Sequence, residues 1–528
     1  MTAGFPRLVL AAGILILAVS SEASDAVQDE FTKLQPALAI ALTAAGAVEL
    51  AALPPTPLIE IEARLDPAGN RITGHQRVWF PNTTGTALDT MALRLPANGA
   101  CFQGASLTVT AATWNGQVLP EPESRHAGAG LVWRLPAALP PGASGCLDLD
   151  FTTTVSINGG YHGLLSRTGD SWCLYHWHPE LPGRDHAGWR LPPVVPIGDQ
   201  TQDVLMHVQV RLSVPSGMQV ISGGSIKNRC ISPVDDTVEI VAPMTRNLAL
   251  VLARDLVCDE KPCGGTLVRS WHRPQVPQAG RRALALGVGS LRFFGERIGP
   301  YPYAELDVVE MIQGAEVGGM ESSGLVLIDT TLYDKCESMP EECGSEIMPI
   351  FMLTLVVAHE VAHQWWYTII GSDSFNDPWL DESITNWAGG WYGECVLNRA
   401  AGAGALSLCY MTVMTRPEGL KKAADLPLDG YQDMTEYGVV VYGRGALMYQ
   451  ALRRAVGEDR FAAFLHDYHD RNRFRVATPA AWKACVERVL GPQQTKVFMD
   501  TWLSAKGMTA SKAIQASLLP LPLPPVAP

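Results

Sequence analysis

Charged residues are scarce in this 528-residue sequence, and positive charge is the scarcer kind. Only 18% of the residues are charged, and 40 Lys and Arg stand against 53 Asp and Glu, which gives a net charge of −13. Phosphate binding requires a basic face, so this balance argues against nucleic acid as a partner. The length predicts about two to four domains, and 47% hydrophobic residues is an ordinary share for globular domains.

Long apolar runs are absent after the N-terminus. The apolar segment 36–53 is interrupted by Gly46 and Glu49. A membrane-spanning helix needs about 20 consecutive apolar residues. We therefore expect no membrane span once the first 23 residues have been removed.

Those first residues have the pattern of an export signal. Arg7 precedes an apolar run at 8–19, and the small residues Ser21 and Ala23 occupy positions −3 and −1 of a cut after residue 23. Residues 1–23 are therefore predicted to be a signal peptide, which places the protein in the periplasm or outside the cell. The alternative is an uncleaved N-terminal membrane anchor.

The sequence also lacks any pair of cysteines separated by two residues, which disfavours a zinc site built on cysteine. Its eleven cysteines favour disulfides in an oxidising compartment. Two close pairs are each predicted to close a small loop: Cys258 with Cys263, and Cys336 with Cys343. One sequence does not fix connectivity, and three further pairs stay open: Cys101/Cys146, Cys173/Cys230 and Cys395/Cys409. The odd count leaves at least one thiol free, and Cys485 is the candidate.

Periodicity divides the chain into two main parts. Period-two alternation, as in 203–215, together with frequent turn signals predicts an all-β sandwich over residues 57–254. Residues 255–515 combine strands and helices and become helical from about residue 396. Residues 24–56 form a lead-in segment, and the Pro-rich tail 516–528 is expected to be disordered.

A zinc site is indicated where the sequence reads HEVAH. His359 and His363 are one helical turn apart, so both imidazoles project from the same face of a helix. Eighteen residues separate His363 from Glu382. Two histidines, one glutamate and an open fourth position predict a catalytic site for one Zn²⁺ per chain, whereas a structural site would fill all four positions. The alternative is a core helix with two hydrogen-bonded histidines.

Three motifs, in this order and spacing, resemble the M1 family of zinc aminopeptidases. They are GGMESSGLVLID at 318–329, HEVAHQWW with WLDES at 359–383, and VVYGRGALMYQAL at 440–452. The resemblance covers about 57–505. It implies a multidomain α+β fold, in which an N-terminal β-sandwich precedes a thermolysin-like mixed α/β zinc peptidase domain with a helical C-terminal part. The large C-terminal helical domain of longer members does not fit in the remaining sequence.

The resemblance also implies catalytic roles. Glu360 would be the general base, which takes a proton from a zinc-activated water and delivers it to the leaving amine. Tyr442, sixty residues after Glu382, would donate a hydrogen bond to the oxyanion of the tetrahedral intermediate. Tyr431 and Tyr437 compete for that role on chemistry alone.

The GGMES motif would bind the substrate. The Glu321 carboxylate would pair with the free α-ammonium of a peptide and so make the enzyme an aminopeptidase. Gly318 and Gly319 would let the backbone approach the substrate, and Met320 belongs to the same substrate-binding motif. The alternative is an acidic strand terminus with glycines that accommodate a bulge.

Two positions depart from the family pattern, and one further segment contains a pair of histidines that could bind a second metal ion. Ser322 replaces the family's Asn, which alters the hydrogen bonding around the substrate strand, and Arg444 replaces a Lys with its charge retained. His176 and His178 could face one side of a strand and hold a metal. No third ligand is evident nearby. The resemblance implies instead that residues 173–182 line the substrate pocket, because the family's N-terminal domain sends a loop into the pocket there.

The sequence therefore predicts a zinc-dependent aminopeptidase that removes N-terminal residues from peptides with a free N-terminus. Two alternatives stay open. One is an epoxide hydrolase of the leukotriene A4 hydrolase type, which shares the zinc site. The other is a catalytically inactive peptide-binding protein on the same fold, although the intact ligands, base and tyrosine argue against it.

Overall fold

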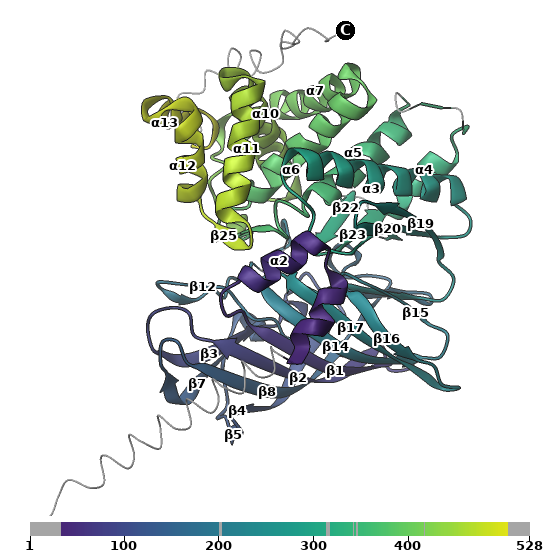
Figure 1. Ribbon diagram of the computed structural model, residues 1–528, viewed down its shortest axis with the longest axis vertical. Coiled ribbons are helices and arrows are strands. Elements are labelled where there is room, and N and C mark those ends of the chain that lie inside the picture. The colour runs from purple at the N-terminus through teal and green to yellow at the C-terminus, as the bar shows by residue number, and fades with distance from the viewer. Residues whose placement is uncertain are drawn as a thin grey trace, which may run out of the picture.

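The structure is a computed structural model that describes residues 33–199, 203–312, 317–341, 343–344, 347–416 and 418–504. The predicted signal peptide and the Pro-rich tail lie outside the described residues. Strands dominate up to His272, and helices dominate after it (Figure 1). This is the multidomain α+β fold that the sequence predicts.

An eight-stranded sheet forms the base of the N-terminal part, in the order β16-β17-β14-β1-β2-β8-β4-β5. Its strands are β1 (Leu58–Asp66), β2 (Arg71–Pro81), β4 (Ser106–Trp114), β5 (Gln117–Val118), β8 (Ser144–Thr154), β14 (Met206–Pro215), β16 (Ser225–Cys230) and β17 (Asp235–Thr245). Along β14, Val208, Val210 and Leu212 are fully buried, while Gln209 and Arg211 between them are partly exposed or exposed. The two-residue period predicted for this strand is confirmed.

Smaller sheets cover the inner face of this sheet. One has the order β3-β7-β6, another has the order β15-β18-β11-β10-β9, and β12 pairs with β13. Their strands are β3 (Leu88–Arg94), β6 (Glu123–Arg125), β7 (Gly130–Leu139), β9 (Ser156–Ile157), β10 (Ser166–Thr168), β11 (Ser171–Leu174), β12 (Arg184–Asp185), β13 (Gly188–Trp189), β15 (Gln219–Ser222) and β18 (Leu250–Ala253). Leu93, Trp172 and Val210 come from three different sheets and belong to one buried cluster. The N-terminal part therefore has the core of a sandwich.

The C-terminal part begins with a five-stranded sheet in the order β19-β20-β21-β23-β22. Its strands are β19 (Val257–Cys263), β20 (Thr266–His272), β21 (Glu305–Met311), β22 (Gly319–Ser322) and β23 (Leu325–Asp329). β20, β21 and β23 are parallel, whereas β22 runs antiparallel to β23 and lies at the edge. An edge strand has backbone groups free to pair with another chain. This edge faces the candidate site.

Helices pack on this sheet and then extend beyond it (Figure 1). They are α3 (Pro277–Arg297), α4 (Thr330–Glu337), α5 (Met348–Ala362), α6 (Trp379–Tyr392), α7 (Arg399–Thr415), α8 (Glu418–Lys421), α9 (Met434–Tyr437), α10 (Gly445–Val456), α11 (Glu458–Asn472), α12 (Pro479–Leu490) and α13 (Pro492–Trp502). A short parallel pair, β24 (Ile370–Ser372) with β25 (Arg475–Ala477), links them. Within the described ranges, none of the helices has the length and apolar character needed to cross a membrane.

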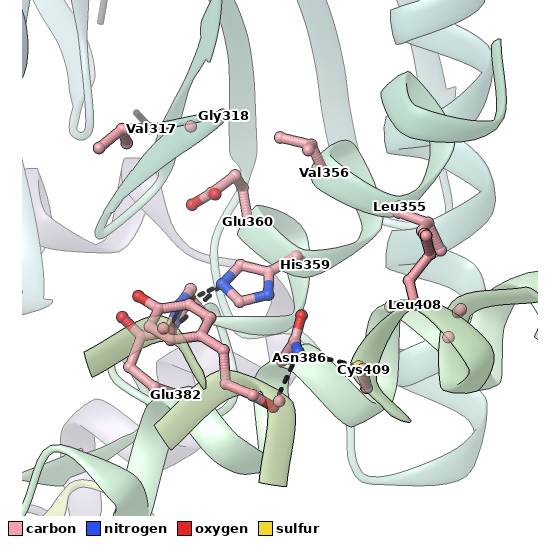
Figure 2. A pocket seen from close by; sticks show the side chains of 18 of the residues that line it. Val317, Gly318, Leu355, Val356, His359, Glu360, Glu382, Asn386, Leu408 and Cys409 are labelled. Carbon is pink, nitrogen blue, oxygen red and sulfur yellow. Dashed lines mark hydrogen bonds and ion pairs between the residues drawn. The ribbon is translucent and has the colours of Figure 1, made fainter. Parts of the chain in front are cut away.

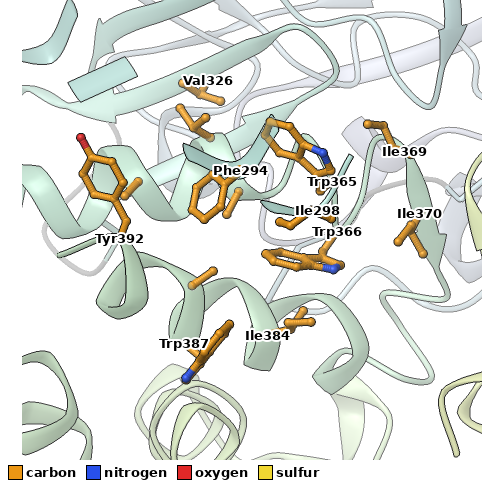
Figure 3. Close-up of a cluster of buried hydrophobic side chains, with 14 of the residues drawn as sticks. Phe294, Ile298, Val326, Trp365, Trp366, Ile369, Ile370, Ile384, Trp387 and Tyr392 are labelled. Atoms are coloured by element: carbon orange, nitrogen blue, oxygen red, sulfur yellow. The ribbon is translucent and has the colours of Figure 1, made fainter. Parts of the chain in front are cut away.

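Aromatic side chains fill the centre of the helical part (Figure 3). Phe294 of α3 lies with its ring centroid 5.6 Å from that of Trp365, which follows α5. Ile384 and Trp387 of α6 and Val326 of β23 are buried in the same cluster. This shared core holds α5 and α6 against the sheet, and these two helices carry the candidate metal ligands.

The predicted disulfides are not formed, because all eleven cysteines are free thiols. Cys258 and Cys263 both lie on β19, opposite Trp271 and Thr266 of β20. A strand rises about 3.3 Å per residue, so their Cα atoms lie roughly 16 Å apart, far beyond the limit of about 7 Å for a disulfide. The stapled loop predicted here is therefore wrong. The other suggested pairs are also unbonded: Cys336/Cys343, Cys101/Cys146, Cys173/Cys230 and Cys395/Cys409.

A buried arginine joins the two parts of the molecule. Arg246 follows β17 and is 0% exposed. Its guanidinium donates to the carbonyls of Thr368 at 2.9 Å, Ile369 at 3.2 Å and Arg475 at 2.9 Å in the helical part, and to that of Asp203 in the β-rich part. Burial lowers the pKa of Arg246 to about 10. Asp203, Thr368 and Ile369 are buried, so burial separates their carbonyls from the solvent that could replace this donor.

Replacing this arginine should destabilise the protein. We expect Arg246→Met to lower the free energy of unfolding by about 2–5 kcal/mol, because several buried carbonyls would lose their donor. Arg254→Met is the control, since Arg254 is exposed and donates only to the Ser216 carbonyl at 3.1 Å. Chemical denaturation measures both variants. Equal midpoints for the two would contradict the role of Arg246.

Candidate metal centre and substrate pocket

Three predicted ligands converge at one point although they come from two helices. His359 lies in the last turn of α5, His363 directly follows that helix, and Glu382 lies in the first turn of α6. The two Nε2 atoms are 3.1 Å apart, and Glu382 Oε2 lies 3.4 Å from each of them. Close packing of α5 on α6 therefore assembles the set that the sequence predicts.

These distances fit a zinc ion. Four-coordinate zinc with bonds of about 2.0–2.2 Å holds neighbouring ligand atoms about 3.4 Å apart, which matches the observed triangle. Glu382 Oε2 is buried and has no hydrogen-bond donor. His363 Nδ1 lies 3.0 Å from the Trp366 carbonyl. Donation from that nitrogen leaves the Nε2 lone pair free for a metal.

Glu360 lies beside the triangle but outside it. A ligand atom from each of Glu321, Glu360 and His363 falls within one 4.8 Å cluster. Glu360 Oε2 is buried without a hydrogen-bond partner. Burial raises the pKa of Glu360 well above its usual range. The carboxylate is therefore a strong base that faces the space where a substrate would bind.

The ligands open into a cavity of about 560 Å³. Its walls come from β22, α5, α6, α7, the π-helical segment η7 (Gly438–Arg444), and the loop that includes Asp199. Figure 2 shows Glu360, His359 and Glu382 facing this space. A cavity of this size holds a small peptide.

The β22 edge strand borders the cavity, and its residues alternate. Gly318, Gly319 and Glu321 line the cavity, whereas Met320 is buried in the sandwich core. Met320 was predicted to bind substrate, but successive side chains of a strand face opposite sides. A Cβ at Gly319 would lie 2.5 Å from Glu360 Oε1. Gly319 is therefore needed to make room for the base, a reason that the sequence did not reveal.

Ser322 has a defined place in this structure. Its hydroxyl donates to the Asn247 side-chain carbonyl at 3.0 Å, and the Ser323 N–H donates to the same oxygen at 3.1 Å. Gln364, next to the ligand His363, donates to the Ser322 carbonyl at 2.9 Å and accepts from the Gly324 N–H at 2.9 Å. The substrate strand is thus tied to both the β-rich part and the metal-binding segment.

Tyr442 reaches the metal ligands from a π-helical segment, a type of irregularity that is frequent at functional sites. Its ring stacks on that of His359 with the centroids 5.8 Å apart, and burial, followed by the nearby charge of Glu382, raises the pKa of its hydroxyl well above the usual range. Tyr442 lines the cavity, whereas Tyr437 is 1% exposed and does not. Tyr431 likewise donates to the carbonyl of Ala424, away from the cavity. The geometry therefore favours the tyrosine chosen from the sequence.

Arg444, the second departure, is buried beside this segment. It is 0% exposed, and it donates to the Gly419 carbonyl at 3.1 Å. Burial lowers its pKa to about 10. The residue supports the backbone around Tyr442 and does not line the cavity.

Sequence reasoning missed the cavity residues that come from the β-rich part, which are His162, Gly198 and Asp199. The Asp199 carboxyl shares a hydrogen bond with Glu382. Burial raises the pKa of Asp199 well above its usual range, and the charges of Glu321 and Glu382 add to this shift. Burial likewise raises the pKa of Glu321 to about 8, against the charge of His363. No motif marks Asp199, because a loop brings it to the site.

Residues 173–182 do not line the cavity, contrary to expectation. His176 Nδ1 pairs with Glu180 at 2.5 Å, and His178 Nδ1 lies 3.0 Å from the Gln76 side-chain oxygen. Both histidines are buried and do not belong to the groups of described residues that could hold a metal. Tyr175 of the same segment donates to the Glu321 carbonyl at 2.9 Å. The segment therefore supports the substrate strand from behind.

Comparisons with known proteins agree with this geometry. Residues 282–502 match the model of the peptidase family M1 domain. Aminopeptidase M1-B of Oryza sativa is 25% identical over 380 residues, which cover 70% of this chain and 41% of that protein. Human aminopeptidase N is 26% identical over 241 residues, which cover 43% of this chain and 24% of that protein. The chain thus spans well under half of these relatives.

Solved structures share the fold over most of the chain. The crystal structure of an M1 zinc metallopeptidase from Deinococcus radiodurans has a TM-score of 0.61 at 20% identity, with 89% of this chain and 96% of that chain covered. A mutant of that enzyme bound to a Tyr-Ser-Ala substrate has a TM-score of 0.60 at 20% identity, with 86% and 95% covered. Residues 282–502 of this chain therefore match the peptidase family M1 domain, and the described structure shares the fold of an M1 zinc metallopeptidase.

Proposed function

We propose that the protein is a zinc aminopeptidase that removes the N-terminal residue from peptides. The observation that carries this proposal is the position of Glu321. Its carboxylate lies in the same cavity as the ligands His359, His363 and Glu382 and the base Glu360. A peptide α-ammonium is the group that a buried carboxylate there would bind. The predicted signal peptide supports a place outside the cytoplasm for this activity.

His359, His363 and Glu382 would hold one zinc ion. When bound, zinc lowers the pKa of a water in its open position and polarises a carbonyl oxygen. The hydrogen bond from His363 Nδ1 to the Trp366 carbonyl orients that imidazole for the task. Glu360 would accept the proton of the attacking water and deliver it to the leaving amine.

Glu321 would fix the cleavage position one residue from the N-terminus, because it would anchor the substrate amine. With the α-ammonium at this carboxylate, the first peptide carbonyl would lie near the ligand triangle, because Glu321 and the ligands line the same cavity. Tyr442 would donate to the oxyanion that forms at this carbonyl, because it lines the same cavity and its ring stacks on the ligand His359. The tripeptide bound to the Deinococcus radiodurans relative supports a peptide substrate.

The two alternatives have less support. An inactive peptide-binding protein has no need for two ligand histidines, Glu360 and Tyr442 arranged around one point. An epoxide hydrolase needs a tunnel for a lipid, whereas this cavity is acidic near the metal ligands, where Asp199, Glu321 and Glu360 meet. Three carboxylates there favour a cationic group.

The zinc content of two variants should distinguish the metal ligands from the general base. We expect His363→Ala to lose its zinc, because two ligands leave the ion weakly held. Glu360→Gln should retain about one zinc per chain and lose most turnover, because only proton transfer is removed. Elemental analysis of purified protein measures the first effect and peptide hydrolysis the second. Full zinc occupancy in His363→Ala would refute the ligand assignment.

Tyr442→Phe should lower kcat by about 100-fold or more with little change in KM, because the hydroxyl acts mainly in the transition state. Tyr437→Phe is the matched control, since that ring packs against Tyr442 with centroids 5.5 Å apart but does not line the cavity. Steady-state kinetics on one peptide compares the two variants. A loss confined to Tyr437→Phe would show that the wrong tyrosine has been assigned.

Glu321→Gln should impair the cleavage of free-amine peptides by about 2–4 kcal/mol in kcat/KM, because an ammonium would enter a buried site without its partner. N-acetylated peptides should be poor substrates of the parent protein and gain relative to free peptides in the variant. The measurement is the ratio of kcat/KM for matched free and acetylated peptides. An unchanged ratio would mean that Glu321 does not bind the amine.

A further inference from the structure

The cavity has two chemically different ends. Its charged lining residues gather around the metal ligands and include Asp199, Glu321 and Glu360. The lining residues at the other end are mostly apolar or small: Met352, Leu355, Val356, Ala405 and Leu408, with Gly389 and Gly390 between them, while Asn386, Cys409 and Thr412 are the polar residues on this side. We propose that this apolar end binds the side chain of the substrate's second residue, so that the protein prefers peptides with a large apolar residue there. This inference rests on the proposed aminopeptidase function.

The direction of the substrate follows from β22. Going back along this strand from Glu321, a Cβ at Gly319 would lie 2.5 Å from Glu360 Oε1, and a Cβ at Gly318 would lie 2.9 Å from Val356. A peptide paired with this edge and anchored at Glu321 therefore passes the base first and Val356 next. The residue after the scissile bond meets the apolar end.

Helix α5 forms the first wall of that end. Met352, Leu355 and Val356 lie seven, four and three residues before His359, so the metal-binding face of α5 continues as an apolar stripe. All three side chains are only partly buried, although they lie in the middle of a domain. The described structure leaves this stripe open to the cavity.

Helix α7 forms the facing wall. Leu408 packs with Leu355 in a small apolar cluster that is separate from the main core. Figure 2 shows these two leucines together, on the side of His359 away from Glu382. A Cβ at Gly390 of α6 would lie 3.2 Å from the Ala405 Cβ, so the glycine keeps the wall between α6 and α7 thin.

This lining would distinguish between substrates by the polarity of the second side chain, which it buries. A Leu or Phe side chain at the second position would leave water for apolar surroundings, whereas an Asp would lose hydration without gaining a partner. We expect a kcat/KM preference of about 10–100-fold for Leu over Asp.

The test uses the zinc-loaded protein and three free-amine substrates with the same first residue. That residue is the amino acid whose amide the protein cleaves fastest. The substrates are this amino acid amide, which has no second side chain, and two tripeptides with Leu or Asp in the second position. Leu408→Ala should reduce the preference for Leu about tenfold, and Leu408→Lys should shift it toward Asp. Each tripeptide rate is divided by the amide rate of the same variant.

Leu406→Ala is the matched control, because Leu406 lies on the same helix but packs on the main core and does not line the cavity. It should leave the preference of the parent unchanged. Calorimetric binding of both tripeptides to Glu360→Gln, alone and combined with Leu408→Ala, should show the same order of affinities.

Equal rates for Leu and Asp peptides in the parent, or equal preferences in the Leu408→Ala and Leu406→Ala variants, would overturn the inference while amide cleavage still upholds the aminopeptidase. No cleavage of any free-amine substrate by the zinc-loaded parent would instead overturn the proposed function, and this inference with it.

Discussion

The concentration of buried carboxylates around one point is the constraint on which the site depends. Asp199, Glu321, Glu360 and Glu382 line one cavity with His363, and the last three carboxylates act on the charge of His363. Like charges at this range raise one another's pKa, and burial adds to the effect. Such a cluster is stable in its charged form only when cations share the space. A divalent metal and, under the proposed function, a substrate ammonium are cations of suitable size and position. Repulsion among the buried carboxylates would therefore favour cationic ligands.

The helices and the edge strand are held in register by polar groups next to the ligands. Gln364 follows His363 and bonds the backbone on both sides of the turn between β22 and β23. Ser383, next to Glu382, donates to the Val441 carbonyl at 2.7 Å and so fixes the segment that carries Tyr442. The residues adjacent to the ligands therefore position the β22 edge strand and the segment that carries Tyr442.

The sequence predicted those parts of the site whose geometry is local. The spacing of His359 and His363 on one helix determines their common face, and the β14 alternation determines its buried side. Asp199 could not be predicted, because its place depends on how a loop of the β-rich part docks against α6. Met320 was placed wrongly since the motif was treated as a unit, although strand alternation alone sends its side chain into the core.

The β-rich part supports β22, the strand that would pair with a substrate under the proposed function. Asn247 accepts hydrogen bonds from Ser322 and Ser323, and Tyr175 donates to the Glu321 carbonyl. The short side chain of Ser322 thus reaches an amide that is supplied by the other part of the molecule. A strand held from two sides keeps its free edge straight, which a peptide must match in order to place its amine and its carbonyl together.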